Sequence, residues 1–542
     1  MTGRAFKLAI LATVAWCGAS AVASADPPAG LDARVETIRQ QVGVPGMAVT
    51  IVENGRTTYA HGFGVRRLGS NGRVDADTIF HIGSISKAFT TAAIGILVDQ
   101  GKLNWDDKVI DHIPWFQMYD PWVTREMTVR DLLVHRSGLG LGEGDLMFVP
   151  RSSLTRRETV RRLRYLRPAT SFRSGYAYDN VLYMVAGQLI EEVSGQTWED
   201  FVRDNILRPA GMRTATDNTA DRRRTVNRAW PHARNDGPMH GMGTQVVLDD
   251  SGRGPYDPEL APSSNPAGGV TASANDMGHW MALQLAHGQL PNGQRVFSEA
   301  ASHEMWSPQV HIPIGQYPAP VSGATPQFQS YALGWTERDY RGHRLLMHTG
   351  AVIGQQGILI LIPEKNVGIS VMINCEDGEA ALGVAYELLD HYLGEPHFDW
   401  GAAWQQFVHD RDQRAVAALN AQTAAPAQVG PSLALANYAG DYVDPWYGPI
   451  SVTQQGDKLV VNFRQTPGMV GEATHWQYDT FRVVWGDPVI EPAYMTFNLG
   501  ADGKVDRIRM RAISPQADFS FDYQDLDFQP AGATAAAAHN EE

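Results

Sequence analysis

The sequence predicts a mixed α/β (α+β) unit with an antiparallel sheet, followed by a small all-β, barrel-like domain. Three observations lead to this prediction. The 542 residues exceed the size of one ordinary domain. Strands joined by turns lie on both sides of a helix-rich middle, which is typical of an α+β unit. Beyond a stretch rich in Ala, Gln and Pro at 421–431, short strands follow one another closely, as in barrels.

The first 25 residues have the features of a secretory signal. Arg4 and Lys7 provide a positively charged start, an apolar stretch follows, and an A-x-A cleavage site ends at Ala25. A membrane anchor is the alternative, but the apolar stretch is short for a membrane span. We therefore expect cleavage after Ala25, a periplasmic or secreted protein, and no stable membrane anchor. Cleavage also removes Cys17, so Cys375 is left without a disulfide partner in the chain.

The composition is typical of a soluble globular protein, with 43% hydrophobic and 19% charged residues. The net charge of −14 argues against nucleic acid as a partner. One basic stretch at 151–166 is predicted to be helical, and it is too isolated to change that conclusion. We interpret it as a solvated helix, with a site for an acidic substrate as the alternative. The sequence leaves the oligomeric state open.

The α/β unit begins with an amphipathic helix and a hairpin. Apolar residues recur at helical spacing from Leu31 to Val42. The turn Asn54-Gly55 then joins a strand at 47–52 to a strand at 56–62. A helix at 380–393 is expected to close the unit, after strands at 331–339, 344–349, 357–363 and 367–374.

The composition suggests four parts after the signal. We expect the α/β unit at 26–400, a linker at 401–432, the all-β domain at 433–529 and a disordered, Ala-rich tail at 530–542. Strands of the all-β domain are predicted at 438–442, 450–454, 458–463, 480–484, 494–499 and 505–511.

Ser84 and Lys87 are the candidate catalytic pair. The residues from Ser84 to Gln100 are predicted to be helical, and Gly101 provides a stop. Residues three apart share a helix face, so the hydroxyl and the amine can meet as a nucleophile and a base. The positive end of the helix also favours negative charge that develops near Ser84. Taken alone, such a motif can equally be an exposed capping serine beside a solvated lysine.

A long polar stretch at 213–264 is expected to form loops and short strands near the site, where substrate choice often resides. His232 and His240 lie in it and suggest a metal. They are far apart, and no carboxylate or Cys stands at ligand spacing from them. We therefore expect no metal and no other cofactor.

Four motifs follow one another along the α/β unit. They are Ser84-x-x-Lys87, the run LLVHRSGL at 132–139, Tyr178-Asp179-Asn180, and His348-Thr349-Gly350. In this order they resemble the serine β-lactamase and penicillin-binding protein superfamily, in its class C-like branch. That branch also contains DD-peptidases, D-aminopeptidases and esterases. The resemblance runs from about Leu31 to Gly394 and implies a β-lactamase-like fold.

The resemblance also implies a role for each residue. Ser84 would attack a carbonyl, Lys87 would take the Ser84 proton with a pKa lowered by desolvation, and Tyr178 would act as second general base and acid. Substrate-binding roles fall to the Asn180 side chain, to Thr349 and Gly350, and to the backbone N–H groups of Ser84 and Ala351, which would form an oxyanion hole.

His348 departs from the pattern of the β-lactamases in this branch, which usually have Lys there. A lysine is a fixed cation suited to a β-lactam carboxylate, whereas histidine is a weaker and pH-dependent one. An unperturbed histidine titrates at about 6.5, so we expect His348 to influence activity at mildly acidic pH. The histidine is more similar to the peptidase and esterase members.

The all-β domain resembles the lipocalin-like domain attached to some peptidases of this superfamily. In architecture and length, the whole chain is similar to bacterial peptidases that cleave linearised microcystin.

The resemblance thus implies an exported serine hydrolase that forms an acyl-enzyme on Ser84 and cleaves short linear or D-residue-containing peptides. The alternatives are a carboxylesterase or β-lactamase-like hydrolase and a non-catalytic penicillin-recognising scaffold, and the substrate is a peptide or another small molecule. All four motifs precede the predicted linker, so we expect the acyl-enzyme step to remain possible without the all-β domain, with a changed substrate range or stability.

Overall fold

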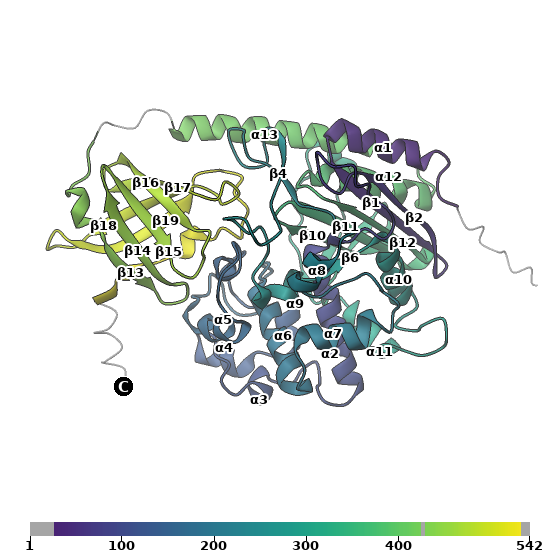
Figure 1. The fold of residues 1–542 in the computed structure, drawn as a ribbon. Helices are drawn as coiled ribbons and strands as arrows, with labels where there is room; N and C mark the ends of the chain where they lie inside the picture. Colours follow the sequence, from purple (N-terminus) through teal and green to yellow (C-terminus); the bar gives the residue numbers. More distant parts are fainter. Residues whose placement is uncertain (1–25, 424–428, 533–542) are drawn as a thin grey trace, which may run out of the picture.

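The computed structural model describes residues 26–423 and 429–532. These residues form an α/β unit and a β-barrel that lie side by side (Figure 1). Helix α13 (Trp400–Thr423) runs along one edge of the α/β unit towards the barrel. The predicted signal at 1–25 lies outside the described residues, as does the predicted tail from residue 533 onward.

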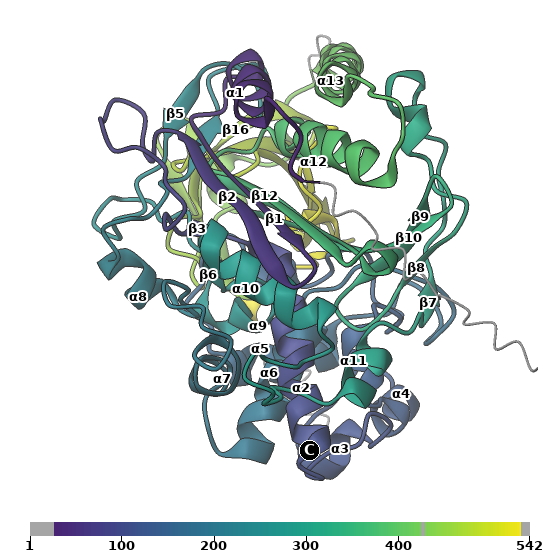
Figure 2. The same ribbon diagram turned by 90° about the vertical axis from the view of Figure 1, so that its right-hand side faces the viewer.

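An eight-stranded antiparallel sheet forms the centre of the α/β unit, and helices cover both of its faces (Figure 2). In the strand that starts at Gly46, Met47 and Val49 pack towards the face that the first and last helices of the unit cover. Ala48 packs into the core on the opposite face, as expected for alternation along a strand. In sheet order the strands are β2 (Arg56–Gly64), β1 (Gly46–Glu53), β12 (Val367–Ile373), β11 (Gln355–Ile362), β10 (His343–Val352), β9 (Thr336–Tyr340), β8 (Gln329–Tyr331) and β7 (Val310–His311).

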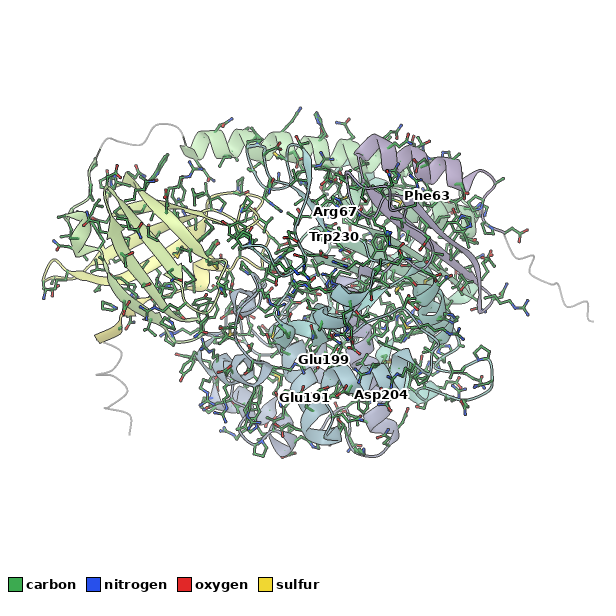
Figure 3. The ribbon with its side chains drawn as sticks, viewed as in Figure 1. Phe63, Arg67, Glu191, Glu199, Asp204 and Trp230 are labelled. Carbon is green, nitrogen blue, oxygen red and sulfur yellow. The ribbon has the colours of Figure 1, made fainter. Side chains whose placement is uncertain are left out.

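Helices α1 (Leu31–Val42) and α12 (Gly378–Leu393) lie on one face of the sheet (Figure 2). The other face carries α10 and the helical region. In that region Glu191 and Glu199 lie close together (Figure 3), and both bind the Arg156 guanidinium, which ties three helices to one another. The helices there are α2 (Lys87–Asp99), α3 (Val109–His112), α4 (Pro121–Glu126), α5 (Arg156–Arg162), α6 (Val181–Ser194), α7 (Trp198–Val202), α8 (Thr219–Arg224), α9 (Asn265–Gly268), α10 (Ala274–Leu285) and α11 (Glu299–Met305).

The second unit is a nearly closed antiparallel barrel. Alternate residues of its strands point inwards, as Leu459, Val461 and Phe463 do in β15. Backbone hydrogen bonds between Ile508 and Phe528 link its two outer edges. In sheet order the strands are β19 (Val505–Ala512), β18 (Ala493–Leu499), β17 (Thr480–Trp485), β16 (Val470–Gln477), β15 (Lys458–Phe463), β14 (Gly448–Gln455), β13 (Gly440–Asp444) and β20 (Gln529–Pro530).

The predicted fold class is confirmed, including the β1–β2 hairpin and the helix that follows Ser84. The sequence analysis missed β16, because that strand is largely polar and its inward residues Gly471 and Ala473 are small. Pro530, assigned to the tail, pairs instead with Tyr442 of β13.

The predicted linker at 401–432 is wrong as far as Thr423, because this part is helix α13. Ala and Gln are good helix formers, so a composition typical of linkers is equally typical of a helix. Trp400 and Trp404 anchor the helix in the core beneath it, where the Trp400 indole N–H donates to Asp390 Oδ2 over 2.7 Å. Residues 424–428 of the predicted linker lie outside the described residues.

A proline in the middle of α13 tests this correction. Arg414 is an exposed residue of the helix. Arg414→Pro should lower the free energy of unfolding by about 3 kcal/mol, because proline removes a helical hydrogen bond and clashes with the preceding turn. Arg414→Ala should change it by less than about 0.5 kcal/mol. Urea denaturation of both variants measures the difference, and equal midpoints would mean that this segment is a linker.

Candidate active site

Ser84 lies on a 3₁₀ turn, Gly83–Ser86, that leads directly into α2. The end of β10 lies against this turn. A Cβ added to Gly83 would lie 2.5 Å from the Ala351 nitrogen, and one added to Gly350 would lie 1.9 Å from the Ile82 oxygen. Because β9 pairs with β10 only as far as Met347, the following residues of β10 have a free edge beside Ser84. The two glycines therefore allow the backbone amides of Ser84 and Ala351 to approach one another, as an oxyanion hole requires.

Lys87 is fully buried, and its amine contacts three groups. Nζ lies 3.0 Å from Ser84 Oγ, 2.7 Å from Asn180 Oδ1 and 3.0 Å from the Ala267 carbonyl oxygen. A neutral amine has two N–H groups and one lone pair. Asn180 and Ala267 can only accept at these atoms, so they take the two N–H groups and leave the lone pair for the Ser84 hydroxyl. Ser84 can thus donate its proton to Lys87.

Burial lowers the pKa of Lys87 to about 7, although Asp145 and Asp179 act in the opposite direction. A large fraction of the amine is therefore neutral near pH 7, which a general base requires. The sequence predicted this direction of shift from desolvation.

Asn180 lies beside the catalytic lysine, and its expected contact with the substrate amide stays a prediction. Besides accepting from Lys87, its amide Nδ2 donates to Asp145 Oδ2 over 2.8 Å. The side chain is thus held between Lys87 and Asp145, and it positions the amine. Burial raises the pKa of Asp145 to about 8, against the donors Asn180 and Ser520.

The Tyr178 ring lies over the Lys87 amine, 4.8 Å from Nζ to the ring centroid. Its hydroxyl lies near Ser84 but makes no hydrogen bond of normal geometry with any described residue. Burial raises the pKa of Tyr178 well above its usual value, which the Ser84 hydroxyl offsets only in part. The phenol is therefore suited to donate a proton rather than to be the resting base.

His348 is brought into the same region, but it does not titrate as expected. Tyr331 OH lies 2.9 Å from Nε2, and Nδ1 lies 2.6 Å from the Thr349 carbonyl oxygen. The carbonyl can only accept, so Nδ1 carries the proton and Nε2 accepts from Tyr331. Burial, together with the neighbouring Lys87, lowers the pKa of His348 to about 3. The expected titration of His348 near pH 6.5 is thus wrong.

The segment 132–139, known from the sequence only as a motif, supports the loop that carries Tyr178. Ser137 Oγ donates to Asp179 Oδ2 over 2.7 Å, and the Asp179 amide donates to His135 Nδ1 over 3.1 Å. The Ala177 amide donates to the His135 carbonyl. These bonds fix the backbone on both sides of Tyr178.

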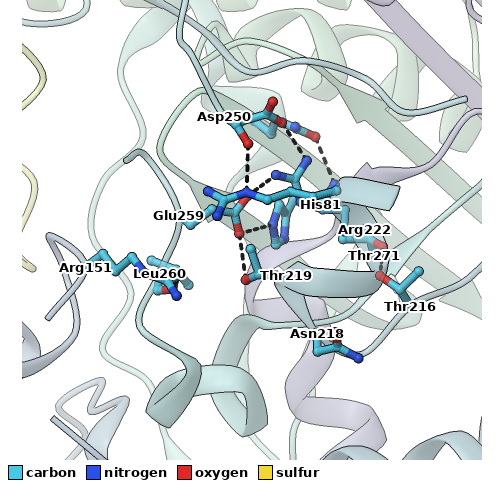
Figure 4. A network of polar contacts seen from close by, with 12 residues as sticks. His81, Arg151, Thr216, Asn218, Thr219, Arg222, Asp250, Glu259, Leu260 and Thr271 are labelled. Carbon is cyan, nitrogen blue, oxygen red and sulfur yellow. Dashed lines mark hydrogen bonds and ion pairs between the residues drawn. The ribbon is translucent and has the colours of Figure 1, made fainter. Parts of the chain in front are cut away.

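The stretch 213–264 contains α8 and two short strands, β4 (His232–Arg234) and β5 (Gln245–Val247). A buried ion network ties it to the site (Figure 4). Glu259 accepts hydrogen bonds from His81 Nε2 over 3.2 Å and from Arg222, which also binds Asp250 over 2.7 Å. Burial works against the charge of Glu259, but His81 and Arg222 lower its pKa. The network fixes this stretch to His81, three residues before Ser84.

The two histidines considered for a metal have other partners. His232 accepts from the Leu68 amide and contacts the Asn374 carbonyl over 2.7 Å, and burial lowers its pKa to about 4. His240 pairs with Glu376 over 2.7 Å.

The sequence analysis missed Asp145, Tyr331 and three residues of the barrel. For Asp145, the signal available in the sequence was a carboxylate that follows the 132–139 motif closely. Sequence offered none for the barrel residues, which lie more than 400 positions beyond Ser84. They are Phe519, whose ring contacts Tyr178, Ser520, which donates to Asp145, and Asp522, which accepts backbone amides at 144 and 146.

Known proteins match both units. Residues 31–393 match the family model described as Beta-lactamase, and residues 424–530 match a domain of unknown function, DUF3471. The unguisins hydrolase ungD' of Aspergillus campestris is 28% identical over 427 residues, 76% of this chain and 74% of its own. Penicillin-binding protein 4 of Amycolatopsis lactamdurans is 27% identical over 378 residues, 67% of this chain and 88% of its own.

Solved structures show the same fold. The octameric penicillin-binding protein homologue from Pyrococcus abyssi aligns with a TM-score of 0.57 and 20% identity, over 92% of this chain and 98% of that one. The penicillin-binding protein from Bacillus halodurans aligns with a TM-score of 0.52 and 19% identity, over 66% and 99%.

The fold and the buried Ser–Lys pair define a serine hydrolase. The chain belongs to the β-lactamase and penicillin-binding protein family, as the motifs in the sequence predicted. Among the described residues, no helix combines the length and the apolar character needed to cross a membrane.

The pH dependence of acylation should follow Lys87 and not His348. The rate constant for labelling Ser84 with a fluorophosphonate should rise with pH through a midpoint at about 7, because only the neutral amine accepts the Ser84 proton. His348→Gln has no titratable group, yet it keeps an amide that can accept from Tyr331, so the midpoint should stay in place. A midpoint that disappears in His348→Gln would contradict this assignment.

A charge placed at Asn180 tests the environment of Lys87. In Asn180→Asp a carboxylate would face Nζ where the amide oxygen now lies at 2.7 Å. An opposite charge at such a distance favours the ammonium form, so the labelling midpoint should rise by about one pH unit or more. Asn180→Ala removes the acceptor without adding charge, so it should not raise the labelling midpoint. The account of the pair fails if the two variants have the same midpoint.

Proposed function

We propose that the protein is an exported peptidase that cleaves amide bonds of short linear or D-residue-containing peptides through an acyl-enzyme on Ser84. The observation that carries the proposal is the contact of Lys87 with Ser84, Asn180 and Ala267. It leaves the lone pair of a fully buried amine directed at the nucleophile.

The chemistry proceeds in two halves. Ser84 Oγ attacks the carbonyl carbon while its proton passes to Lys87 Nζ, and the backbone amides of Ser84 and Ala351 stabilise the oxyanion. When the C–N bond breaks, the Tyr178 phenol protonates the leaving nitrogen and regains a proton from the Lys87 ammonium. Water then attacks the acyl carbon while its proton passes to Lys87. The Lys87 ammonium gives that proton to Ser84 Oγ as the C–O bond breaks, so Ser84 and the neutral amine are restored and the carboxylic acid leaves.

Two features favour a peptidase over a β-lactamase. His348 is neutral and already bonded to Tyr331 and Thr349, so it supplies no cation for a β-lactam carboxylate. Similar proteins that extend over much of the chain include one named as a hydrolase of unguisins and one named as a penicillin-binding protein. The chain also resembles, in architecture and length, peptidases that cleave linearised microcystin.

Labelling and a substrate panel test the proposal. The mature protein should react with a fluorophosphonate at Ser84, and peptide mapping locates the adduct. It should cleave members of a panel of short L- and D-peptides more efficiently than a p-nitrophenyl ester or nitrocefin. Ser84→Ala should lose at least about 10³-fold in kcat, as removal of a nucleophile does elsewhere.

Two outcomes would contradict this proposal. Labelled protein that turns over the ester and no peptide would be a carboxylesterase with the same acyl chemistry. Equal peptide turnover by wild type and Ser84→Ala would remove Ser84 from the mechanism.

A further inference from the structure

A loop of the barrel, residues 513–522, reaches the α/β unit next to the catalytic residues. Asp522 is fully buried, and its two carboxylate oxygens accept the backbone amides of Gly144 over 2.6 Å and Leu146 over 3.0 Å. Ser520 Oγ donates to Asp145 Oδ2 over 2.8 Å. Three hydrogen bonds therefore hold the loop on residues 144–146.

These bonds continue to the catalytic amine. Asp145 Oδ2 accepts from both Ser520 and Asn180, each over 2.8 Å. Asn180 in turn accepts from Lys87 over 2.7 Å. An unbroken path of hydrogen bonds thus joins a barrel side chain to Lys87.

The same loop places an aromatic ring beside Tyr178. The ring of Phe519 meets the ring of Tyr178 edge to face, with 6.1 Å between centroids. A Cβ added to Gly142 would lie 2.5 Å from Phe519 Cδ2, and the Gly142 amide donates to the Tyr178 carbonyl, so this glycine lets the loop approach. Phe519 nevertheless remains 39% exposed, and Leu141 beside Gly142 remains 53% exposed.

We infer that the barrel completes the active site. Phe519, with Leu141, forms an apolar subsite for a side chain of the peptide next to the scissile bond, and Ser520 positions Lys87 through Asp145 and Asn180. The inference rests on the proposed function, since it names the substrate feature that the same site selects. The expectation that the acyl-enzyme step is possible without the all-β domain stays a prediction, since Ser520 contacts Asp145 and neither Ser84 nor Lys87 directly.

The subsite predicts a preference for bulky apolar residues. Peptides with Phe at either position flanking the cleaved bond should exceed their Ala counterparts in kcat/KM. We call the kcat/KM of a Phe peptide divided by that of its Ala counterpart the substrate ratio. In the Phe519→Ala variant this ratio should fall about tenfold, mainly through a higher KM for the Phe peptide. The reason is that a lost pocket contact weakens ground-state and transition-state binding alike. Val484→Ala is the matched control, since Val484 is an exposed apolar residue of the same barrel. Its ratio should equal that of the wild type.

The outcomes separate this inference from the proposed function. If the wild type is not labelled at Ser84, both fail. If it is labelled and hydrolyses peptides, but Phe519→Ala keeps the wild-type ratio, only the subsite fails. If it is labelled and hydrolyses only esters, the same ratio is measured on phenylalanine and alanine esters, with the same expected fall.

The positioning role of Ser520 is read from a pH profile. Ser520→Ala removes a donor to Asp145, so the carboxyl is less ionised and favours the Lys87 ammonium less. The midpoint of fluorophosphonate labelling should therefore move to lower pH. Ser520→Thr keeps the hydroxyl, so its labelling midpoint should equal that of the wild type. An unchanged midpoint in Ser520→Ala, with an unchanged melting temperature, would reduce Ser520 to a docking contact and overturn this part.

Discussion

The burial of the Lys87 amine is the constraint on which the rest of the site depends. An ammonium removed from water is costly, so the folded protein shifts this group towards its neutral form and brings its pKa to about 7. Two acceptors then fix the N–H groups and direct the lone pair at Ser84. The same chain segment thus supplies both a nucleophile and its base.

Several parts of the fold maintain that burial. Helix α2 is enclosed along most of its length, and two glycines let β10 lie against the turn that carries Ser84. The 132–139 segment fixes the backbone around Tyr178, which covers the amine on one side. The barrel closes another side through Asp145. One of the contacts between the two units thus reaches the hydrogen bonds that hold the catalytic base.

The sequence predicts what depends on local pattern. Alternation and turn residues predict the β1–β2 hairpin and most barrel strands, and the spacing of Ser84 and Lys87 predicts their meeting on one helix face. The protonation state of His348 depends on a tyrosine seventeen residues earlier and on burial, neither of which spacing reveals. Ser520 and Phe519 belong to another unit, so only the packing of barrel on sheet brings them to Asp145 and Tyr178.

The pKa of the Lys87 amine is the quantity that tests this account most directly. In protein labelled with ¹³C at the lysine ε-carbons, the Lys87 resonance can be assigned by its absence from Lys87→Arg and followed by NMR as a function of pH. The account predicts a midpoint at about 7. A midpoint near the ordinary lysine value of about 10.4 would show that the amine is an ammonium at neutral pH, and would contradict its role as the base.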